Sequence, residues 1–402
     1  MSPPSSRRFV LALIAFATFT DIVAYSVAVP VLPDLTRKLG ASPTTVGLLF
    51  ASFGVTALCT AIPMGVVSDR VGRKGPLVGG LVGLTIASLM LAFASTLPSL
   101  FVARLAQGAA DAVTWVVGFA LLADLYEPAE RGRASGIVMS GASSAFVIGP
   151  SLGGWLYELG GLRLPFLAVA VMSAVAAIAA LGLKASSAHT SRAPVPIMAV
   201  VRVPAVGACA AAVIVAAATM SMLEPVLALH LQALGINPAR VGLVFGIAAV
   251  AAAALHPLYG RLADRLGPRK LTLWGLAVSG CVLPLIGRVV SFESAIPIFV
   301  VQTAALALVI APSLAYMGEA TSSAGLGSFG VAYGLYNVAW GVGLLGGPAI
   351  GGFLFERIGL QRLALWWAPG VMICTALLMR VTNDTQRPSS AVEEALTGSK
   401  VR

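Results

Sequence analysis

The chain has 402 residues, of which 58% are hydrophobic and only 10% are charged. Soluble domains carry about 25% charged residues, so this composition excludes an ordinary water-facing globular surface. The apolar residues occur in long runs separated by short polar or Gly/Pro-containing loops. Each run is about 20 residues long, enough to cross a hydrocarbon core of about 30 Å.

Twelve such runs predict an all-α membrane protein with twelve transmembrane helices. The first run lacks the small-residue cleavage site of a signal peptide, so we interpret it as the first helix. In chain order, the expected spans lie at about 9–31, 44–66, 75–95, 98–122, 134–157, 163–183, 202–231, 239–260, 270–290, 295–318, 326–354 and 361–381.

The formal net charge of +10 is a topology signal rather than a sign of nucleic-acid binding. If the N-terminus is inside, most of the 26 Lys and Arg residues fall in cytoplasmic segments. Cytoplasmic loops of membrane proteins carry this excess of positive charge. We therefore expect a multi-pass protein of a bacterial inner membrane, monomeric, with both termini in the cytoplasm and membrane lipid around it.

An internal repeat divides the chain into two halves. Residues 46–50, 65–74 and 149–154 are echoed by 241–245, 260–270 and 347–352, each about 195 to 198 positions later. Six spans separate the copies, so both halves have the same orientation and are related by a pseudo-two-fold axis along the membrane normal. We expect six-helix halves at 1–183 and 202–382, a cytoplasmic linker at 184–201 and a cytoplasmic tail at 383–402.

These repeated residues resemble the major facilitator superfamily over essentially the whole chain. Residues 65–74 are similar to the signature of its loop between helices 2 and 3, and 104–108 to its helix 4 signature. Five residues resemble the helix 5 motif of its drug/proton antiporters: Gly141, Gly149, Pro150, Gly153 and Gly154. The resemblance implies two packed helical halves and export by proton exchange, with the helix 5 kink sealing against proton leak.

A closer resemblance is to the vesicular amine transporters and their bacterial relatives. Residues 46–52, 104–108, 130–132, 222–225 and 333–334 are similar to that group. The chain departs from it at three functional positions. Phe53 replaces a lysine, Asn337 replaces the carboxylate of helix 11, and the carboxylate of helix 10 falls in an apolar stretch near Ile310. The resemblance therefore implies this fold and export direction, and leaves amine specificity open.

Ionisable residues within the spans are the candidate coupling and substrate groups, because a charge at the bilayer centre costs at least about 2.5–3.5 kcal/mol. Asp21 and Glu224 lie in the first and seventh spans, which correspond in the repeat and should face one central cavity. Arg104 and Asp111 are seven residues apart and share one helix face. They either take part in proton handling, as the resemblance implies for the arginine, or form a static ion pair.

The loop after the second span predicts a cytoplasmic gate. Gly72 allows a tight turn, and Asp69 can sit at the N-terminus of a helix of the other half, where the helix dipole favours an anion. A basic loop that only sets the topology is the alternative reading. The expected gating set is Asp69, Arg70, Gly72, Arg73, Lys74, Asp124, Asp264 and Glu319.

Aromatic side chains suit organic cations through cation–π contact, and several are candidates to line the cavity. They are Tyr25, Trp115, Tyr336 and Trp340. Asn337, between the last two, is a further candidate for the coupling and substrate residues. The sequence contains no Walker loop, metal-ligand cluster or nucleophile elbow. We therefore expect no enzyme activity, no metal and no cofactor, with the proton gradient as the energy source.

The leading interpretation is a proton-coupled antiporter that exports small organic, amine-bearing or lipophilic drug-like compounds, as in multidrug efflux. The alternative is a facilitator or symporter of sugars or metabolites on the same fold. A non-transporting receptor or scaffold would not need buried charges together with a gating loop in each half.

The expected topology is testable with reporter fusions. A reporter fused after Lys184 or at the C-terminus should lie in the cytoplasm, and one inserted near Asn237 should lie in the periplasm. An external signal from the central linker would contradict the twelve-span count.

Overall fold

The computed structural model describes residues 7–183, 204–323 and 329–384, and these residues form helices without any strand. The expected linker at 184–201 and nearly all of the expected tail lie outside the described residues. The helices are α1 (Arg7–Lys38), α2 (Pro43–Val71), α3 (Lys74–Ala92), α4 (Leu97–Leu125), α5 (Pro128–Gly160), α6 (Arg163–Leu181), α8 (Pro204–Ala233), α9 (Pro238–Leu266), α10 (Pro268–Val282), the 3₁₀ helix η1 (Leu283–Arg288), α11 (Phe292–Ser323) and α12 (Phe329–Asp384).

Eleven helices of the described chain are long and apolar enough to cross a membrane. The last of them, α12, contains two of the predicted spans, which join at Gly359. Gly359 has a φ of 71°, a backbone conformation that glycine adopts without steric cost. The described helices are therefore compatible with the twelve spans expected from the sequence.

Matching helix starts reflect the internal repeat. The side chain of Ser42 accepts a hydrogen bond from the backbone N–H of Thr45 at the start of α2. In the same way, Asn237 accepts from the N–H of Arg240 at the start of α9. Each cap is followed by a proline, which is favoured at the first helical position because its missing N–H needs no partner there.

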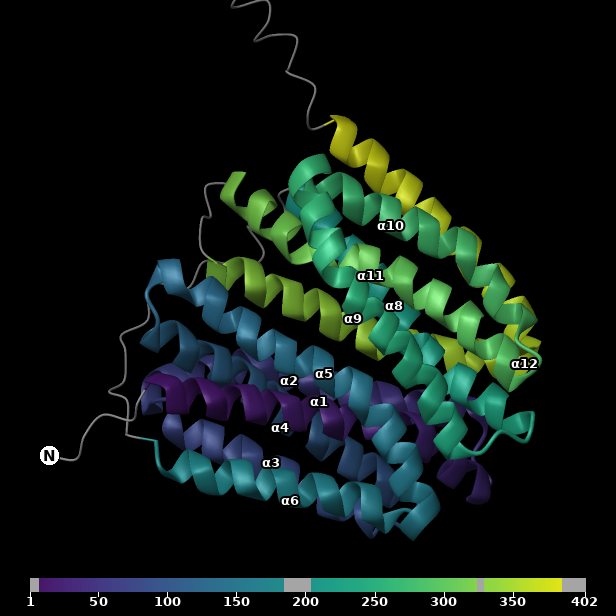
Figure 1. The fold of residues 1–402 in the computed structure, drawn as a ribbon, viewed down its shortest axis with the longest axis horizontal. Coiled ribbons are helices and arrows are strands. Elements are labelled where there is room, and N and C mark those ends of the chain that lie inside the picture. Colours follow the sequence, from purple (N-terminus) through teal and green to yellow (C-terminus); the bar gives the residue numbers. More distant parts are fainter. Residues whose placement is uncertain (1–6, 184–203, 324–328, 385–402) are drawn as a thin grey trace, which may run out of the picture.

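The helices form two groups that follow the halves of the sequence. Figure 1 shows α1–α6 on one side of the molecule and α8–α12 on the other. Two pairs of long helices make the main contact between the groups: α2 packs against α12, and α5 packs against α9.

Glycines bring these paired helices into close contact at one end. A Cβ on Gly154 would lie 2.8 Å from the Cα of Ala239, and a Cβ on Gly352 would lie 2.9 Å from the Cα of Gly47. We call this the closed end; it carries the turns before α2 and α9. Small residues allow helices to approach closely within a membrane, where lipid supplies no hydrophobic drive for packing.

The opposite end, which carries the turn between α2 and α3, lacks such contacts and is called the open end. A Cβ added to Gly136 of α5 or to Gly260 of α9 would meet no atom within 4 Å. A cavity of about 500 Å³ lies between α5 and α9 in this region, lined by residues that include Ser140, Ser144 and His256. The two halves are thus joined at one end and separated at the other.

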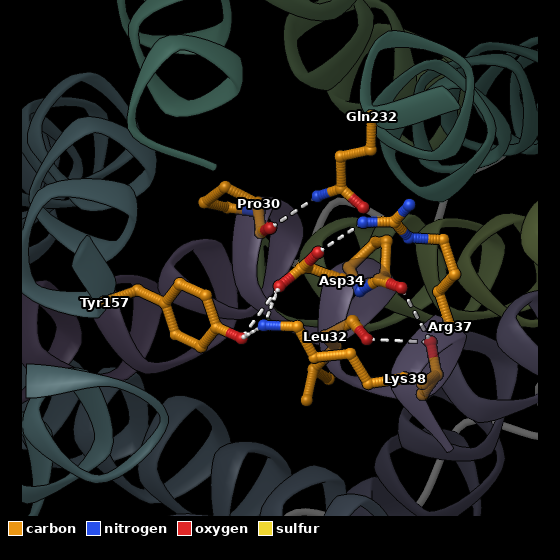
Figure 2. A network of polar contacts seen from close by, with 9 residues as sticks. Pro30, Leu32, Asp34, Arg37, Lys38, Tyr157 and Gln232 are labelled. Atoms are coloured by element: carbon orange, nitrogen blue, oxygen red, sulfur yellow. Dashed lines mark hydrogen bonds and ion pairs between the residues drawn. The ribbon is translucent and has the colours of Figure 1, made fainter. Parts of the chain in front are cut away.

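A polar network adds to the contact at the closed end (Figure 2). The nearly buried carboxylate of Asp34 forms ion pairs with Arg37 at 2.9 Å and Lys38 at 2.8 Å, and accepts a hydrogen bond from Tyr157 of α5 at 2.8 Å. The Gln232 amide of α8 donates to the backbone oxygen of Pro30 at 2.9 Å. That hydrogen bond joins the halves, since Pro30 lies in α1.

Substitution of a closed-end glycine should weaken this arrangement. A Cβ on Gly242 of α9 would lie 2.8 Å from the backbone carbon of Pro150, so Gly242→Ala should force the helices apart. We expect the purified protein to lose a few degrees of thermal stability, since overpacking costs about 1–3 kcal/mol.

Gly79→Ala is the matched control, because Gly79 of α3 has open space at the same position. Equal melting temperatures for the two variants would show that the close approach of α5 and α9 contributes nothing to stability.

Candidate functional site

A hydrogen bond between two buried side chains joins the two halves near the centre of α1 and α8. The Tyr25 hydroxyl donates to Oε2 of Glu224 at 2.5 Å. Both side chains are 6% exposed. Glu224 precedes Pro225 in α8, and Tyr25 lies one turn after Asp21 in α1, so the corresponding helices of the repeat face each other here.

Arg104 of α4 is fully buried beside this bond and is surrounded by aromatic rings. Its guanidinium carbon lies 5.0 Å from the ring centroid of Phe53, 5.2 Å from that of Phe50 and 5.6 Å from that of Tyr25. Its Nη1 donates to Oε1 of Gln107 at 2.7 Å, whereas Nε and Nη2 have no hydrogen-bonding partner. Aromatic faces attract a cation and so partly replace its lost hydration.

The static ion pair between Arg104 and Asp111, the alternative to a role in proton handling, is not formed among the described residues. Asp111 instead lies beside Asp21 of α1, close enough for the two carboxyl groups to interact. Asp21 is 1% exposed, and neither of its oxygens has a hydrogen-bonding partner of suitable geometry. Buried carboxyl groups are normally paired or hydrogen-bonded, so this unpartnered Asp21 is the exceptional group of the site.

Two stacked aromatic pairs lie on helices that reach this region. Trp115 and Phe119 of α4 stack with ring centroids 5.6 Å apart and planes 12° apart. Trp115 follows Asp111 by one turn and approaches Asp21. In the other half, Tyr336 and Trp340 of α12 stack at 6.3 Å and 17°. The predicted aromatic residues thus form one ring pair in each half, while Tyr25 belongs to the contact between the halves.

Asn337, expected beside Glu224 among the coupling and substrate residues, lies between Tyr336 and Trp340 in α12 and is partly buried.

The helix 5 motif holds α5 against both neighbours. A Cβ on Gly153 would lie 2.8 Å from the Cα of Val27, and one on Gly149 would lie 3.0 Å from the Cβ of Ser26, both in α1. Gly154 instead faces α9, and Gly141 approaches α1 near Ala15. Pro150 lies inside α5 with its carbonyl group against Gly242. The motif therefore sets the distance of α5 from the helix that carries Asp21.

Three of the predicted gating residues, Asp69, Arg73 and Asp124, form an ion-pair cluster within the first half. Arg73 pairs with Asp69 at 2.5 Å and with Asp124 at 2.9 Å, and also donates to Ser68. Burial disfavours the charged guanidinium, but the hydrogen bonds to Asp124 and Asp69 outweigh it and raise the pKa of Arg73. Asp69 therefore contacts its own half here, and not a helix of the other half as expected from the sequence.

The turn itself fits the expectation for Gly72, whose φ is 86°. Gly267 has a φ of 89° at the corresponding turn of the second half. Arg70 and Asp264 are exposed and Lys74 is partly exposed at the open end, where Glu319 lies near the end of α11.

Sequence reasoning missed three features of the site. It did not predict the direct contact between Tyr25 and Glu224, the aromatic surroundings of Arg104, or the Asp34 network. The first could have been found by noting that Tyr25 lies one turn from Asp21, on the α1 face expected to meet α8. The other two depend on which side chains meet between helices, and no spacing in the sequence encodes that.

A known protein family and several of its members are similar to this chain over most of its length. The sequence profile of the Major Facilitator Superfamily matches residues 14–206 and again 209–401. A probable vesicular acetylcholine transporter of Danio rerio is 28% identical over 403 residues, covering 94% of this chain and 80% of its own length. The chromaffin granule amine transporter of Homo sapiens is 28% identical over 324 residues, covering 80% of this chain and 62% of its own length.

Solved structures share the fold. A bacterial homologue of the human lysosomal transporter Spinster, inward-facing and unoccupied, superposes with a TM-score of 0.79 at 15% identity, covering 96% of this chain and 100% of that chain. A peptide-bound transporter of the POT family gives a TM-score of 0.76 at 13% identity, covering 94% of this chain and 96% of that chain. The chain therefore belongs to the Major Facilitator Superfamily and is a transporter rather than an enzyme.

Proposed function

We propose that this chain is a proton-coupled antiporter that exports small organic cations by alternating access. One observation carries the proposal: a buried, unpartnered Asp21 lies one helical turn from a hydrogen bond that joins the two halves. A carboxyl group in such a place is stable when it holds a proton or faces a cation, and it is costly when it holds neither.

The exchange of protons for substrate follows from the cost of a buried carboxylate that has neither a proton nor a cation. A proton on the carboxyl groups and a cationic substrate beside them are alternative ways to neutralise the same charge. Because Glu224 receives its hydrogen bond from Tyr25 across the interface, its protonation changes a contact on which the relative position of the halves depends. Proton binding and substrate release are thereby linked to the movement of the two halves that would close one end of the molecule and open the other.

The orientation of the protein in the membrane follows from the excess of Lys and Arg in the expected cytoplasmic segments, which favours the open end as the cytoplasmic one. The described conformation would then accept substrate from the cytoplasm, and its closed end would face the periplasm of a bacterial inner membrane. The protein would act as a monomer without a cofactor, driven by the proton gradient.

Relatives named as acetylcholine and amine transporters support a cationic substrate. Inside-out vesicles with an acidic interior test the proposal directly. Addition of a transported organic cation should dissipate the proton gradient, whereas a sugar facilitator would leave the gradient unchanged.

Glu224→Gln should uncouple transport. Glutamine imitates the protonated carboxyl group permanently, so the site can no longer exchange a proton. We expect uphill accumulation to stop and substrate affinity to fall about ten-fold and lose its pH dependence, since a hydrogen bond to a charged group contributes about 1.5–3 kcal/mol. Uptake into vesicles and binding across a pH series measure both effects.

Glu293→Gln is the control, because Glu293 is exposed at the start of α11 and far in sequence from the site. If Glu224→Gln accumulates substrate with wild-type pH dependence, the role of Glu224 is only structural.

Asp69→Asn should slow transport several-fold with little change in substrate affinity. The substitution keeps the side-chain shape but removes the charge that pairs with Arg73, so it weakens the cluster that positions the α2–α3 turn. Transport rate and equilibrium binding, measured on the same preparation, separate the two parameters. An unchanged rate at normal expression would remove Asp69 from the gate.

A further inference from the structure

The charges buried around Tyr25 do not balance. Three carboxyl groups share one guanidinium, that of Arg104: it acts on Asp111 and Glu224, and Asp21 lies beside Asp111. Arg104 acts electrostatically on Glu224, Tyr25 and Asp111, but it forms no ion pair with any of them. When all of these groups are ionised, two carboxylates therefore lack a counter-charge.

Two features indicate that the missing charge comes from a ligand. Both oxygens of Asp21 are buried and make no hydrogen bond of suitable geometry, although Asp111 and Trp115 lie beside this carboxyl group. Nε and Nη2 of Arg104 are likewise buried without a partner, so the guanidinium is not turned toward the carboxyl pair to neutralise it. An acidic pair that needed only structural compensation would be expected to use this neighbouring cation.

We propose that the site binds a compound with two ammonium groups, one at the Asp21–Asp111 pair and the other at Glu224. This rests on the function proposed above and specifies its substrate class as short diamines. Trp115, which lies beside Asp21, places an aromatic side chain next to the first ammonium group. The Tyr25 bond holds the carboxylate of Glu224 in place for the second.

The spacing along α1 sets the length of the ligand. Asp21 and Tyr25 are four residues apart, which corresponds to about 6 Å along a helix. Because Tyr25 extends from α1 to the carboxylate of Glu224 on α8, the two anionic positions are offset by about one helical turn in the direction of α1. A linear chain of four or five carbon atoms joins two ammonium groups over a similar distance.

This charge balance also specifies how many protons are exchanged for each diamine. A doubly charged diamine leaving the site uncovers two carboxylates, which two protons then neutralise. No net charge crosses the membrane in such a cycle, and the diamine is moved by the pH difference alone.

The test compares ligands that differ in one ammonium group, on the purified full-length protein. Binding of 1,4-diaminobutane and 1,5-diaminopentane is measured by calorimetry against 1-aminobutane and 1-aminopentane. The diamines should bind at least about ten-fold more tightly, since the second ammonium gains its own charged contact. Equal affinities in the wild-type protein overturn the proposal without the use of any variant.

Asp111→Asn locates the effect, because asparagine keeps the side-chain size and removes one charge. The preference for diamines should fall by at least about five-fold, whereas binding of the monoamines should change little. Glu293→Gln, outside the site, should keep the wild-type ratio. An unchanged ratio in Asp111→Asn would mean that neither ammonium group binds at the Asp21–Asp111 pair, and would contradict the proposal.

Gradient dissipation in vesicles distinguishes failure of this inference from failure of the proposed function. If monoamines and diamines dissipate the gradient equally, antiport stands and the preference for two ammonium groups is refuted. If neither class of amine does so, the antiport function itself fails. Dissipation by diamines without a change in membrane potential is the expected result.

Discussion

The arrangement of the central helices depends on the cost of holding carboxyl groups away from water. Asp21 and Glu224 are buried in helices that cross a membrane, where an isolated charge is unstable. One of them is satisfied by Tyr25 from the other half, and the other has no hydrogen-bonding partner. The protein thus contains one carboxyl group that is hydrogen-bonded to Tyr25 and another, that of Asp21, one helical turn from Tyr25 in α1 and without a hydrogen bond. This difference gives a proton or a cation a place to bind.

The two ends of the molecule serve this centre in different ways. At the closed end, glycines let α2 meet α12 and α5 meet α9 at backbone distance, and the hydrogen bond from Gln232 to Pro30 reinforces the contact. At the open end, the halves are apart and the Arg73 cluster is confined to the first half. Asp69 pairs with Arg73 of its own half, an arrangement that would suit the proposed gate in its released state.

Much of the fold follows from periodicity and repetition, whereas the pairing of side chains does not. Apolar runs and matched segments predicted the helices and the superfamily, and Gly359 explains why two predicted spans appear as one helix. The repeat also predicted that the helices of Asp21 and Glu224 face each other. The aromatic surroundings of Arg104 were not predictable, because Phe50 and Phe53 reach it from α2 through tertiary packing that helical spacing does not encode.

Proton release on ligand binding tests the central claim most directly. The account holds that a cation replaces protons at Asp21, Asp111 and Glu224, so addition of an organic amine to the purified protein in weakly buffered detergent solution should release protons. A variant that combines Asp21→Asn with Glu224→Gln should release far fewer. Amine binding with no proton release, or equal release from the double variant, would contradict the account.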